Sequence, residues 1–275
     1  MFWPRFLSFF ILIGLFSISI LLKNIYGRII FAVIFSIGAF GLVYEVLSMF
    51  EKIDKKSYKL ATSITGAIII LCIVFELGFK FTIIIPALLV VVMFITLLDH
   101  RKYDDSLDRM INSASAIMMT ILPLLFLPII YMVGEGTTYQ GREWLIALIL
   151  ITKSGDTGAY CIGMIYNKIS GGKNHKIVPN ISPKKSWEGT IGGCLSSVAV
   201  SICFFDLNTS AILIGILLFF GGFYGDLAES ALKRTCGVKD SGTIIPGMGG
   251  IYDVLDSLLL NAPMFYFFMI LKNVL

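Results

Sequence analysis

Apolar residues in this chain occur in long runs separated by short polar segments. A bilayer hydrocarbon core of about 30 Å requires about 20 apolar residues in one helix, and nine runs approach or exceed that length. The pattern therefore predicts an all-α, polytopic integral membrane protein with about nine transmembrane helices. The runs are Phe6 to Leu22, Ile29 to Met49, Leu60 to Phe79, Phe81 to Leu98, Ala114 to Val133, Trp144 to Tyr166, Glu188 to Phe205, Ala211 to Leu232 and Tyr252 to Leu271.

The distribution of positive charge predicts the orientation of these helices. Sixteen of the 22 lysines and arginines fall at the N-terminus or in the loops after the second, fourth, sixth and eighth runs. Five lie on the opposite side and Lys153 lies inside a run. Because Lys and Arg collect in cytoplasmic loops, we expect a cytoplasmic N-terminus.

Composition excludes several other classes of protein. The 275 residues are 57% hydrophobic and only 15% charged, too apolar for one water-soluble core. The five cysteines are scattered and there are only two histidines, so we expect neither a zinc site nor a histidine-dependent hydrolase. A net charge of +4 is modest, and we expect no nucleic-acid partner.

The two halves of the chain differ in character. Residues 1–140 consist of plain apolar runs, with Glu45 and Glu76 as exceptions, and we expect them to form a lipid-facing scaffold. In residues 141–275, polar and glycine residues enter the runs, and the loops at 167–187 and 235–251 are long and rich in Gly, Lys and Ser. We therefore place the catalytic loops in this second half, on the cytoplasmic side.

Three helices of the second half each carry a polar stripe at helical spacing, which places its members on one face. A single stripe has a simple structural interpretation: a Lys153–Asp156 ion pair, or acids facing cytoplasmic water. Three stripes near one interface favour a polar cavity. The stripes are Lys153, Asp156, Thr157 and Tyr160; Asp226, Glu229, Ser230 and Lys233; and Asp253, Asp256, Ser257 and Asn261.

Converging carboxylates repel one another unless a cation lies between them. Oxygen ligands without His or Cys suit Mg²⁺, which readily shares its ligands with phosphates. Lys184 and Lys185 precede a helix start beside Trp187, and a Gly-rich segment at 246–250 approaches the last helix. We expect a site for metal-bound phosphates that is open to both cytosol and membrane. The Asp104 to Asp108 run matches a DDxxD pattern but has no partner motif, so we interpret it as solvated loop charges.

The spacing of polar residues between about 150 and 260 resembles the integral-membrane phosphatidate cytidylyltransferases, also called CDP-diacylglycerol synthases. The blocks Asp156 to Tyr160 and Ser182 to Gly189 are also similar to that family. Two positions depart from its pattern: Met248 replaces a usual His and Val254 a usual Arg. The residues in register are Ser230, Lys233, Arg234, Lys239, Asp240, Gly242, Pro246, Gly247, Gly249, Gly250, Asp253 and Asp256.

The resemblance implies the reaction of CTP with phosphatidate to give CDP-diacylglycerol and diphosphate, with Mg²⁺ as cofactor. The short chain without a targeting extension favours a bacterial inner-membrane protein, and the charge distribution places the active site on the cytoplasmic side. Membrane lipid and a second copy of the chain, as a homodimer, are the expected partners. The implied metal ligands are Asp226, Asp253 and Asp256, which with Lys233 and Asp240 form the catalytic set. The implied substrate-binding residues are Lys184, Lys185, Ser230, Arg234, Lys239 and Asp156.

Three other classes of protein use intramembrane acids or a cytidine nucleotide. A CDP-alcohol phosphatidyltransferase needs an Asp-Gly pair in its motif, and the chain has none. A CTP-dependent polyprenol kinase remains an alternative, since it would use a cytidine nucleotide on a related helical scaffold. A cation transporter whose carboxylates carry ions is the non-enzymatic alternative.

Overall fold

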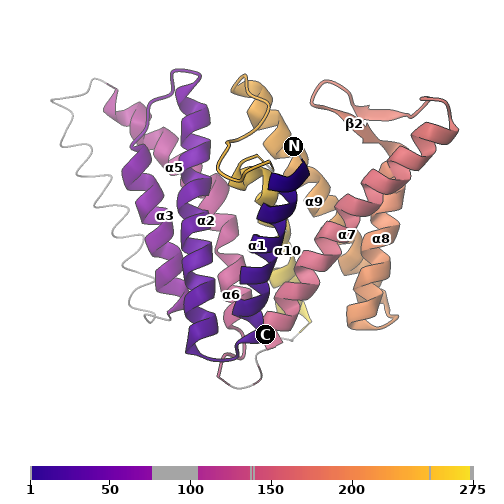
Figure 1. Ribbon diagram of the computed structural model, residues 1–275, viewed down its shortest axis with the longest axis horizontal. Helices are drawn as coiled ribbons and strands as arrows, with labels where there is room; N and C mark the ends of the chain where they lie inside the picture. The colour runs from indigo at the N-terminus through magenta and orange to yellow at the C-terminus, as the bar shows by residue number, and fades with distance from the viewer. Residues whose placement is uncertain (1, 76–104, 137, 139, 248, 273–275) are drawn as a thin grey trace. The chain divides into compact units, whose positions relative to one another are not determined.

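The computed structural model describes residues 2–75, 105–136, 138, 140–247 and 249–272, and the described chain is mostly helical (Figure 1). The long helices follow the apolar runs, because a helix satisfies every backbone polar group within its own segment. The elements are α1 (Phe2–Leu21), α2 (Ile25–Glu51), α3 (Lys59–Val74), α5 (Ser106–Leu124), α6 (Phe126–Met132), α7 (Gln140–Ile169), β1 (Lys176–Val178), β2 (Ser182–Ser186), α8 (Trp187–Phe205), α9 (Thr209–Thr235) and α10 (Ile251–Leu271).

Within the described residues, six helical segments are long and apolar enough to cross a membrane: α2, the α5–α6 stretch, α7, α8, α9 and α10. Helix α3 is apolar but shorter, with 16 residues. The predicted helical membrane architecture is confirmed at this level. The count of nine and the cytoplasmic N-terminus stay predictions, and the predicted run from Phe81 to Leu98 lies outside the described residues.

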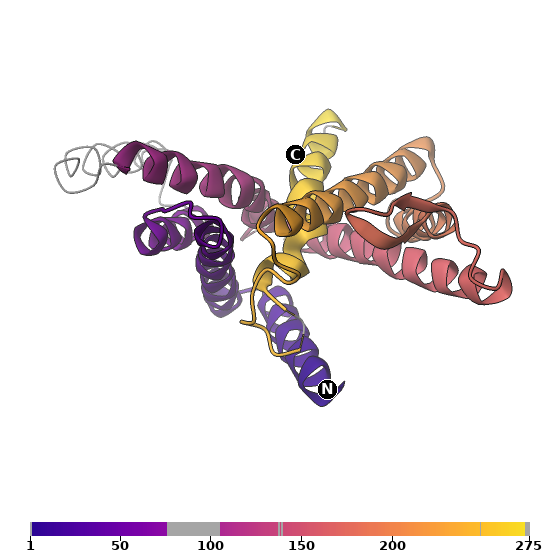
Figure 2. The same ribbon diagram turned by 90° about the horizontal axis from the view of Figure 1, so that it is seen from above.

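The segment after α7 contains two short strands where the sequence indicated only a loop. Strands β1 and β2 pair antiparallel, with Lys176 opposite Ser186 and Val178 opposite Ser182. Pro183 lies within β2. Proline is tolerated there because both strands of a two-stranded sheet are edges. Seen from above, this sheet lies at the end of α8, which begins directly after β2 (Figure 2).

The chain forms two compact units. Unit 1 comprises Met1–Tyr139 and Thr235–Val254, and unit 2 comprises Gln140–Arg234 and Leu255–Leu275. The Gly-rich segment that precedes α10 therefore belongs with the N-terminal helices, although the chain reaches it only after α9. The predicted division into a scaffold of residues 1–140 and a catalytic part of residues 141–275 concerns function, and it stays a prediction.

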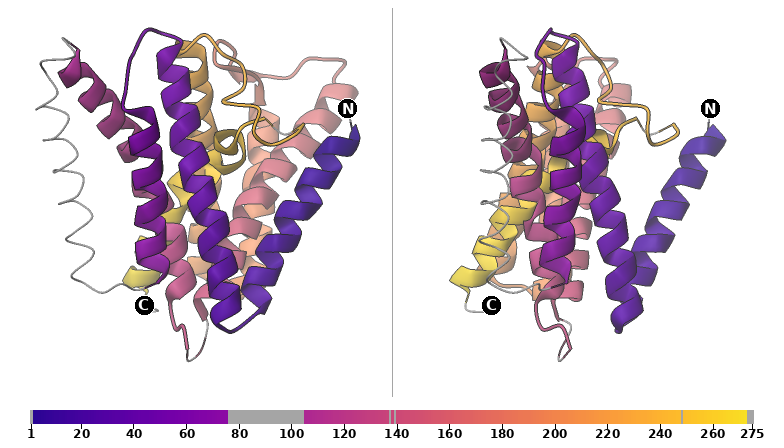
Figure 3. Two further views of the ribbon diagram at one scale, coloured as in Figure 1. Left: turned by 60° about the vertical axis from the view of Figure 1, so that its left-hand side comes forward. Right: turned by 90° about the vertical axis from the view of Figure 1, so that its left-hand side faces the viewer.

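Unit 1 is built around α2. Helices α1 and α2 run in opposite directions on either side of a short connection (Figure 3). At that connection the Asn24 side chain accepts hydrogen bonds from the Tyr26 and Gly27 amides and caps α2. The buried Phe31 ring stacks on the Tyr131 ring with centroids 3.8 Å apart. The Tyr131 hydroxyl donates to the Ser19 carbonyl at 3.0 Å, so α1, α2 and α6 meet at one buried contact.

Unit 2 is held together by small and polar residues. Helices α7 and α8 pack along each other, and the buried Ser197 hydroxyl of α8 donates to the Ile151 carbonyl of α7 at 3.0 Å. The Asn261 amide of α10 donates to the Thr152 hydroxyl of α7 at 2.8 Å and to the Leu218 carbonyl of α9 at 2.7 Å. Small residues let membrane helices approach closely, and such hydrogen bonds join them. The four helices of the candidate site are thereby connected.

Candidate functional site

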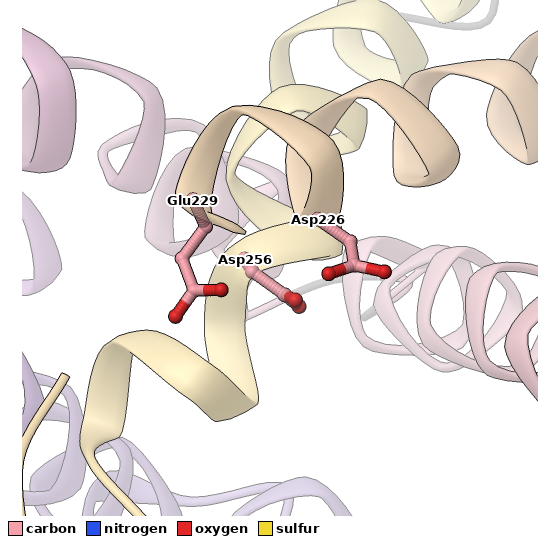
Figure 4. A group of neighbouring side chains, drawn as sticks. All are labelled: Asp226, Glu229 and Asp256. Carbon is pink, nitrogen blue, oxygen red and sulfur yellow. The ribbon is translucent and has the colours of Figure 1, made fainter. Parts of the chain in front are cut away.

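Three carboxylates of unit 2 form one group where α9 meets α10. Asp226 and Glu229 lie on α9 at i and i+3, and Asp256 lies on α10. One ligand oxygen from each lies within 4.8 Å of the others. In Figure 4 the Asp256 side chain lies between those of Asp226 and Glu229. Glu229 is buried, with 1% of its surface exposed, whereas the two aspartates are partly exposed.

A glycine allows the two helices to come this close. A Cβ atom added to Gly225 would lie 2.5 Å from the Asp256 carbonyl oxygen, a distance that a side chain cannot occupy. The α9 backbone therefore approaches the α10 backbone directly beside Asp226. Any larger residue at 225 would separate the carboxylates that the two helices bring together.

Lysines from three directions offset the negative charge of the group. Lys185 lies on β2, and its ammonium lies 2.9 Å from an Asp226 oxygen. The Lys233 ammonium, one turn along α9, lies 2.7 Å from a Glu229 oxygen. On α7, the Lys153 ammonium lies 3.2 Å from an Asp156 oxygen and 2.8 Å from the Ser257 hydroxyl of α10. Two of these three pairs contact the carboxylate group itself.

A cavity of about 300 Å³ opens beside these carboxylates. Its polar lining combines carboxylates with two ammonium groups, and its other walls are aromatic or small residues. A few convergent polar groups beside an apolar wall are typical of a small-molecule site. The polar and aromatic lining residues are Asp156, Tyr160, Lys184, Lys185, Phe219, Phe223, Asp226 and Asp256.

The chemistry of the donors fits a hard divalent cation. Asp226, Glu229 and Asp256 offer only oxygen atoms, and two of the three carboxylates line the open cavity. Mg²⁺ binds oxygen ligands at about 2.0–2.1 Å and usually keeps positions for water and phosphate. A slight closure of these side chains would bring their oxygens to one ion, and the cavity leaves space for the remaining ligands.

The structure distributes the other predicted site residues over both units. In unit 2, the Ser230 hydroxyl lies 3.4 Å from an Asp226 oxygen, Arg234 is exposed near the end of α9, and Asp156 and Lys184 are exposed at the cavity. In unit 1, Lys239 and Asp240 line a second cavity of about 510 Å³. Met248 lies outside the described residues.

Asp253 lies in unit 1 and has a different environment. Its Oδ2 atom accepts hydrogen bonds from the Ser241 amide at 3.0 Å, the Ser241 hydroxyl at 2.8 Å and the Gly250 amide at 2.8 Å. The carboxylate thus joins the first turn of α10 to the loop that precedes this helix. Its predicted role as a metal ligand stays a prediction.

Two acidic residues that are absent from the predicted site residues, Glu229 and Glu45, make defined contacts in the structure. Glu229 is the third member of the carboxylate group. Its position one helical turn after Asp226 indicates, from the sequence alone, that the two side chains share a face. Glu45 is buried in unit 1 and accepts a hydrogen bond from Ser241, which lies in the Gly-rich loop of residues 236–250 between α9 and α10. Its signal was weaker: an acidic residue inside an otherwise apolar run, which is costly in a membrane and therefore requires a partner.

The DDxxD-like run has local partners. Hydrogen bonds from Arg109 and from Lys56 hold the pKa of Asp105 at about 2, below its usual value of 3.8. Asp105 lies 2.9 Å from Arg109 and 3.1 Å from Lys56. This is the environment of a loop carboxylate in an ion-pair network, whereas Asp104 lies outside the described residues.

Curated relatives match about half of this chain. The phosphatidate cytidylyltransferase of Mycobacterium bovis is 34% identical over 158 residues, which cover 55% of this chain and 50% of the relative. That of Staphylococcus aureus (strain COL) is 39% identical over 150 residues, covering 52% and 55%. An uncharacterized protein of Escherichia coli (strain K12) is 39% identical over 138 residues, covering 48% and 44%. The chain thus matches about half the length of these relatives.

A family model extends the match to nearly the whole chain. The model of the cytidylyltransferase family covers residues 3–271, including the plain N-terminal helices as well as the site. The resemblance found in the motifs is therefore confirmed. This chain belongs to the cytidylyltransferase family.

Proposed function

We propose that this chain transfers the cytidylyl group of CTP to phosphatidate, forming CDP-diacylglycerol and diphosphate in phospholipid synthesis. The observation that carries the proposal is the unit 2 cavity, where Asp226 and Asp256 face the same space as Lys184 and Lys185. A triphosphate and a phosphate monoester are both strongly anionic, so their reaction requires cationic groups and a metal at one place. Family membership and the printed names of the relatives support the same reaction.

The reaction balances without a protein nucleophile. A phosphate oxygen of phosphatidate attacks the α-phosphorus of CTP, a new P–O bond forms, and the bond from the α-phosphorus to the α,β-bridging oxygen breaks. Diphosphate leaves with that oxygen and its electron pair. Such transfers depend on positioning and on charge neutralisation. Lys184 and Lys185 line the cavity and would neutralise phosphate oxygens there, and the aromatic wall would exclude water from one side.

Asp226, Asp256 and Glu229 are the residues that would hold Mg²⁺. When bound, the ion would offset the negative charge of the triphosphate and favour departure of diphosphate. Asp253 and the loop residues Lys239 and Asp240 belong to the catalytic set only as a proposal carried over from the motif. Lys233 has a defined local task, since it pairs with Glu229 and limits repulsion within the group.

Aromatic residues at the site support access for a lipid substrate. Trp187 starts α8 beside the lysine pair and is 57% exposed, and Tyr160 at the cavity is 69% exposed. Exposed Trp and Tyr side chains are typical of the membrane–water interface. We also propose that the chain spans a bacterial inner membrane nine times with its N-terminus and active site in the cytoplasm, an orientation that the distribution of Lys and Arg over the loops supports.

The activity is tested with purified, detergent-solubilised full chain, phosphatidate, Mg²⁺ and CTP labelled at either the α- or the γ-phosphorus. We expect label in the lipid from α-labelled CTP, release of diphosphate, and loss of both with EDTA. Label in the lipid from γ-labelled CTP would instead identify a kinase. No lipid product with folded protein under any divalent metal would overturn the proposal and leave the cation transporter as the alternative.

A further inference from the structure

Glu45 is a buried acid in an N-terminal helix of unit 1. Glu45 lies on α2 and is 3% exposed, and its carboxylate faces the beginning of α10. The Ile251 amide donates to Oε1 at 2.9 Å, and the Tyr252 amide donates to Oε2 at 3.0 Å. The first amides of a helix have no partner within that helix. Glu45 therefore supplies, from a distant part of the sequence, the acceptors that the start of α10 requires.

Asp253 completes this arrangement from inside α10. It reaches back to the Gly250 amide at 2.8 Å, as an acidic residue of the first turn does in a capping box. The Ser241 hydroxyl lies 2.8 Å from Asp253 and 3.2 Å from Glu45. The hydroxyl can donate to only one of these two carboxylates at a time. Both carboxylates lie at the start of α10, where the helix dipole favours negative charge.

The Gly-rich loop has the residues that this carboxylate requires. A Cβ atom added to Gly242 would lie 2.5 Å from Glu45 Oε1 and 2.8 Å from its Cδ. One added to Gly250 would lie 2.5 Å from Glu45 Oε2 and 2.0 Å from the Ser241 hydroxyl. Neither glycine has a left-handed backbone, so the constraint on both is space. Glu45 occupies the volume into which side chains at these positions would extend.

We propose that Glu45 is a positioning residue for the catalytic site, which it serves by fixing the Gly-rich loop and the first turn of α10. This role rests on the proposed function. Asp253 and Asp256 lie one turn apart on α10, so a carboxylate that sets the start and rotation of this helix also sets where its acids lie. Groups that hydrogen-bond directly to metal ligands change metal affinity or activity by about 10- to 100-fold when removed. Glu45 acts through α10 rather than on a ligand, so we expect an effect at the lower end of that range.

The direct test of the contact is a double-mutant cycle in melting temperature of the solubilised full chain. Gly242→Ala should lower the melting temperature in the native background, because the new methyl group meets the Glu45 side chain. In a Glu45→Ala background the same change should cost much less, since the obstructing side chain is gone. Gly38→Ala is the control, because Gly38 lies on α2 with Glu45 and a Cβ atom added there would meet nothing within 4 Å. Additive losses would overturn the contact.

The test of positioning is a Mg²⁺ titration of cytidylyl transfer in Glu45→Gln. We expect the Mg²⁺ concentration for half-maximal rate to rise about tenfold and the turnover number of folded protein to fall, because a neutral amide presents N–H groups to the amides of α10. Glu51→Gln removes an exposed acid of the same helix, which pairs with Lys59 at 2.6 Å, and should change neither value.

A merely structural Glu45 would reduce activity only in proportion to the folded fraction and leave the Mg²⁺ requirement unchanged, which would overturn the positioning role. Failure of the proposed function has a different signature. In that case the native chain would show no transfer, while the melting-temperature cycle would still report on the contact between Glu45 and the loop.

Discussion

Each compact unit contains a group of buried or partly buried acids, and the two groups are satisfied by different partners. In unit 2, Asp226 and Glu229 meet lysine ammonium groups, and Asp226 and Asp256 face a cavity. In unit 1, Glu45 and Asp253 meet backbone amides and the Ser241 hydroxyl. Side-chain ammonium groups can move aside for another cation. Backbone amides of a helix start cannot move without disturbing the helix.

This difference separates ligand binding from support. The unit 2 acids can exchange their lysine partners for a metal and phosphates at small structural cost. The unit 1 acids are committed to the geometry of the loop and α10. We therefore expect loss of a unit 2 acid to weaken metal and phosphate binding directly, and loss of a unit 1 acid to destabilise the loop and the first turn of α10 on which it acts.

The largest expected effect concerns the unit 2 acids. Asp226→Asn and Asp256→Asn should each reduce cytidylyl transfer by more than about 100-fold, while the melting temperature changes little because Asn keeps the shape and carries no charge. Activity and melting temperature are measured on the same solubilised samples. Asp108→Asn, an exposed acid in the first turn of α5, is the matched control. A large fall in melting temperature, with activity following the folded fraction, would mean that the group is scaffold.

The second prediction concerns stability in unit 1. Asp253→Ala leaves the Ser241 amide, the Ser241 hydroxyl and the Gly250 amide without their shared acceptor. A lost helix cap costs about 1 kcal/mol and an unsatisfied buried donor about 1–3 kcal/mol, so the melting temperature should fall by several degrees. Asp226→Ala should lower it less. If the order of the two were reversed, the distinction between the units would be wrong.

The membrane class and the polar stripes could be predicted because hydrophobic runs and helical spacing are local properties. Asp226 and Asp256 were expected to converge, and they do so with Glu229. The hydrogen bonds that Asp253 accepts from Ser241 and Gly250 could not be predicted. They depend on how the loop folds back to meet the carboxylate, and a loop of this kind has no periodicity from which to read that contact.

The role of Glu45 illustrates the same limit over a longer distance. The sequence shows that Glu45 is an acid in an apolar run and therefore costly to bury. Its partners Ile251 and Tyr252, however, lie more than 200 residues later in the chain. The sheet at β1 and β2 was missed for a different reason. The strands have three and five residues, and Pro183 in the second argues against a strand unless it lies at an edge.

The smallest effect should come from replacing Lys185. This change tests whether the unit 2 acids can exchange a lysine partner for a metal ion. Lys185 Nζ lies 2.9 Å from Asp226, donates to the Phe223 carbonyl at 3.0 Å and lies 4.1 Å from the centre of the Phe223 ring. Because this ammonium pairs with the Asp226 carboxylate, it would compete with a divalent cation for the same oxygens. Lys185→Met should therefore raise the affinity for Mn²⁺, followed by its electron paramagnetic resonance signal. The gain should be up to about fivefold, the equivalent of about 1 kcal/mol for a partly exposed ion pair.

Turnover with CTP should fall in the same variant, since the phosphates lose a positive charge, so metal affinity and rate should change in opposite directions. Lys184→Met is the matched control. It lines the same cavity but is exposed, so it should lower turnover while leaving Mn²⁺ affinity near the native value. If Lys185→Met bound Mn²⁺ no more tightly than the native chain, Lys185 would not compete for the Asp226 carboxylate. The pair would then be a fixed support like the Glu45 contacts, and the contrast between the two units would not extend to this lysine.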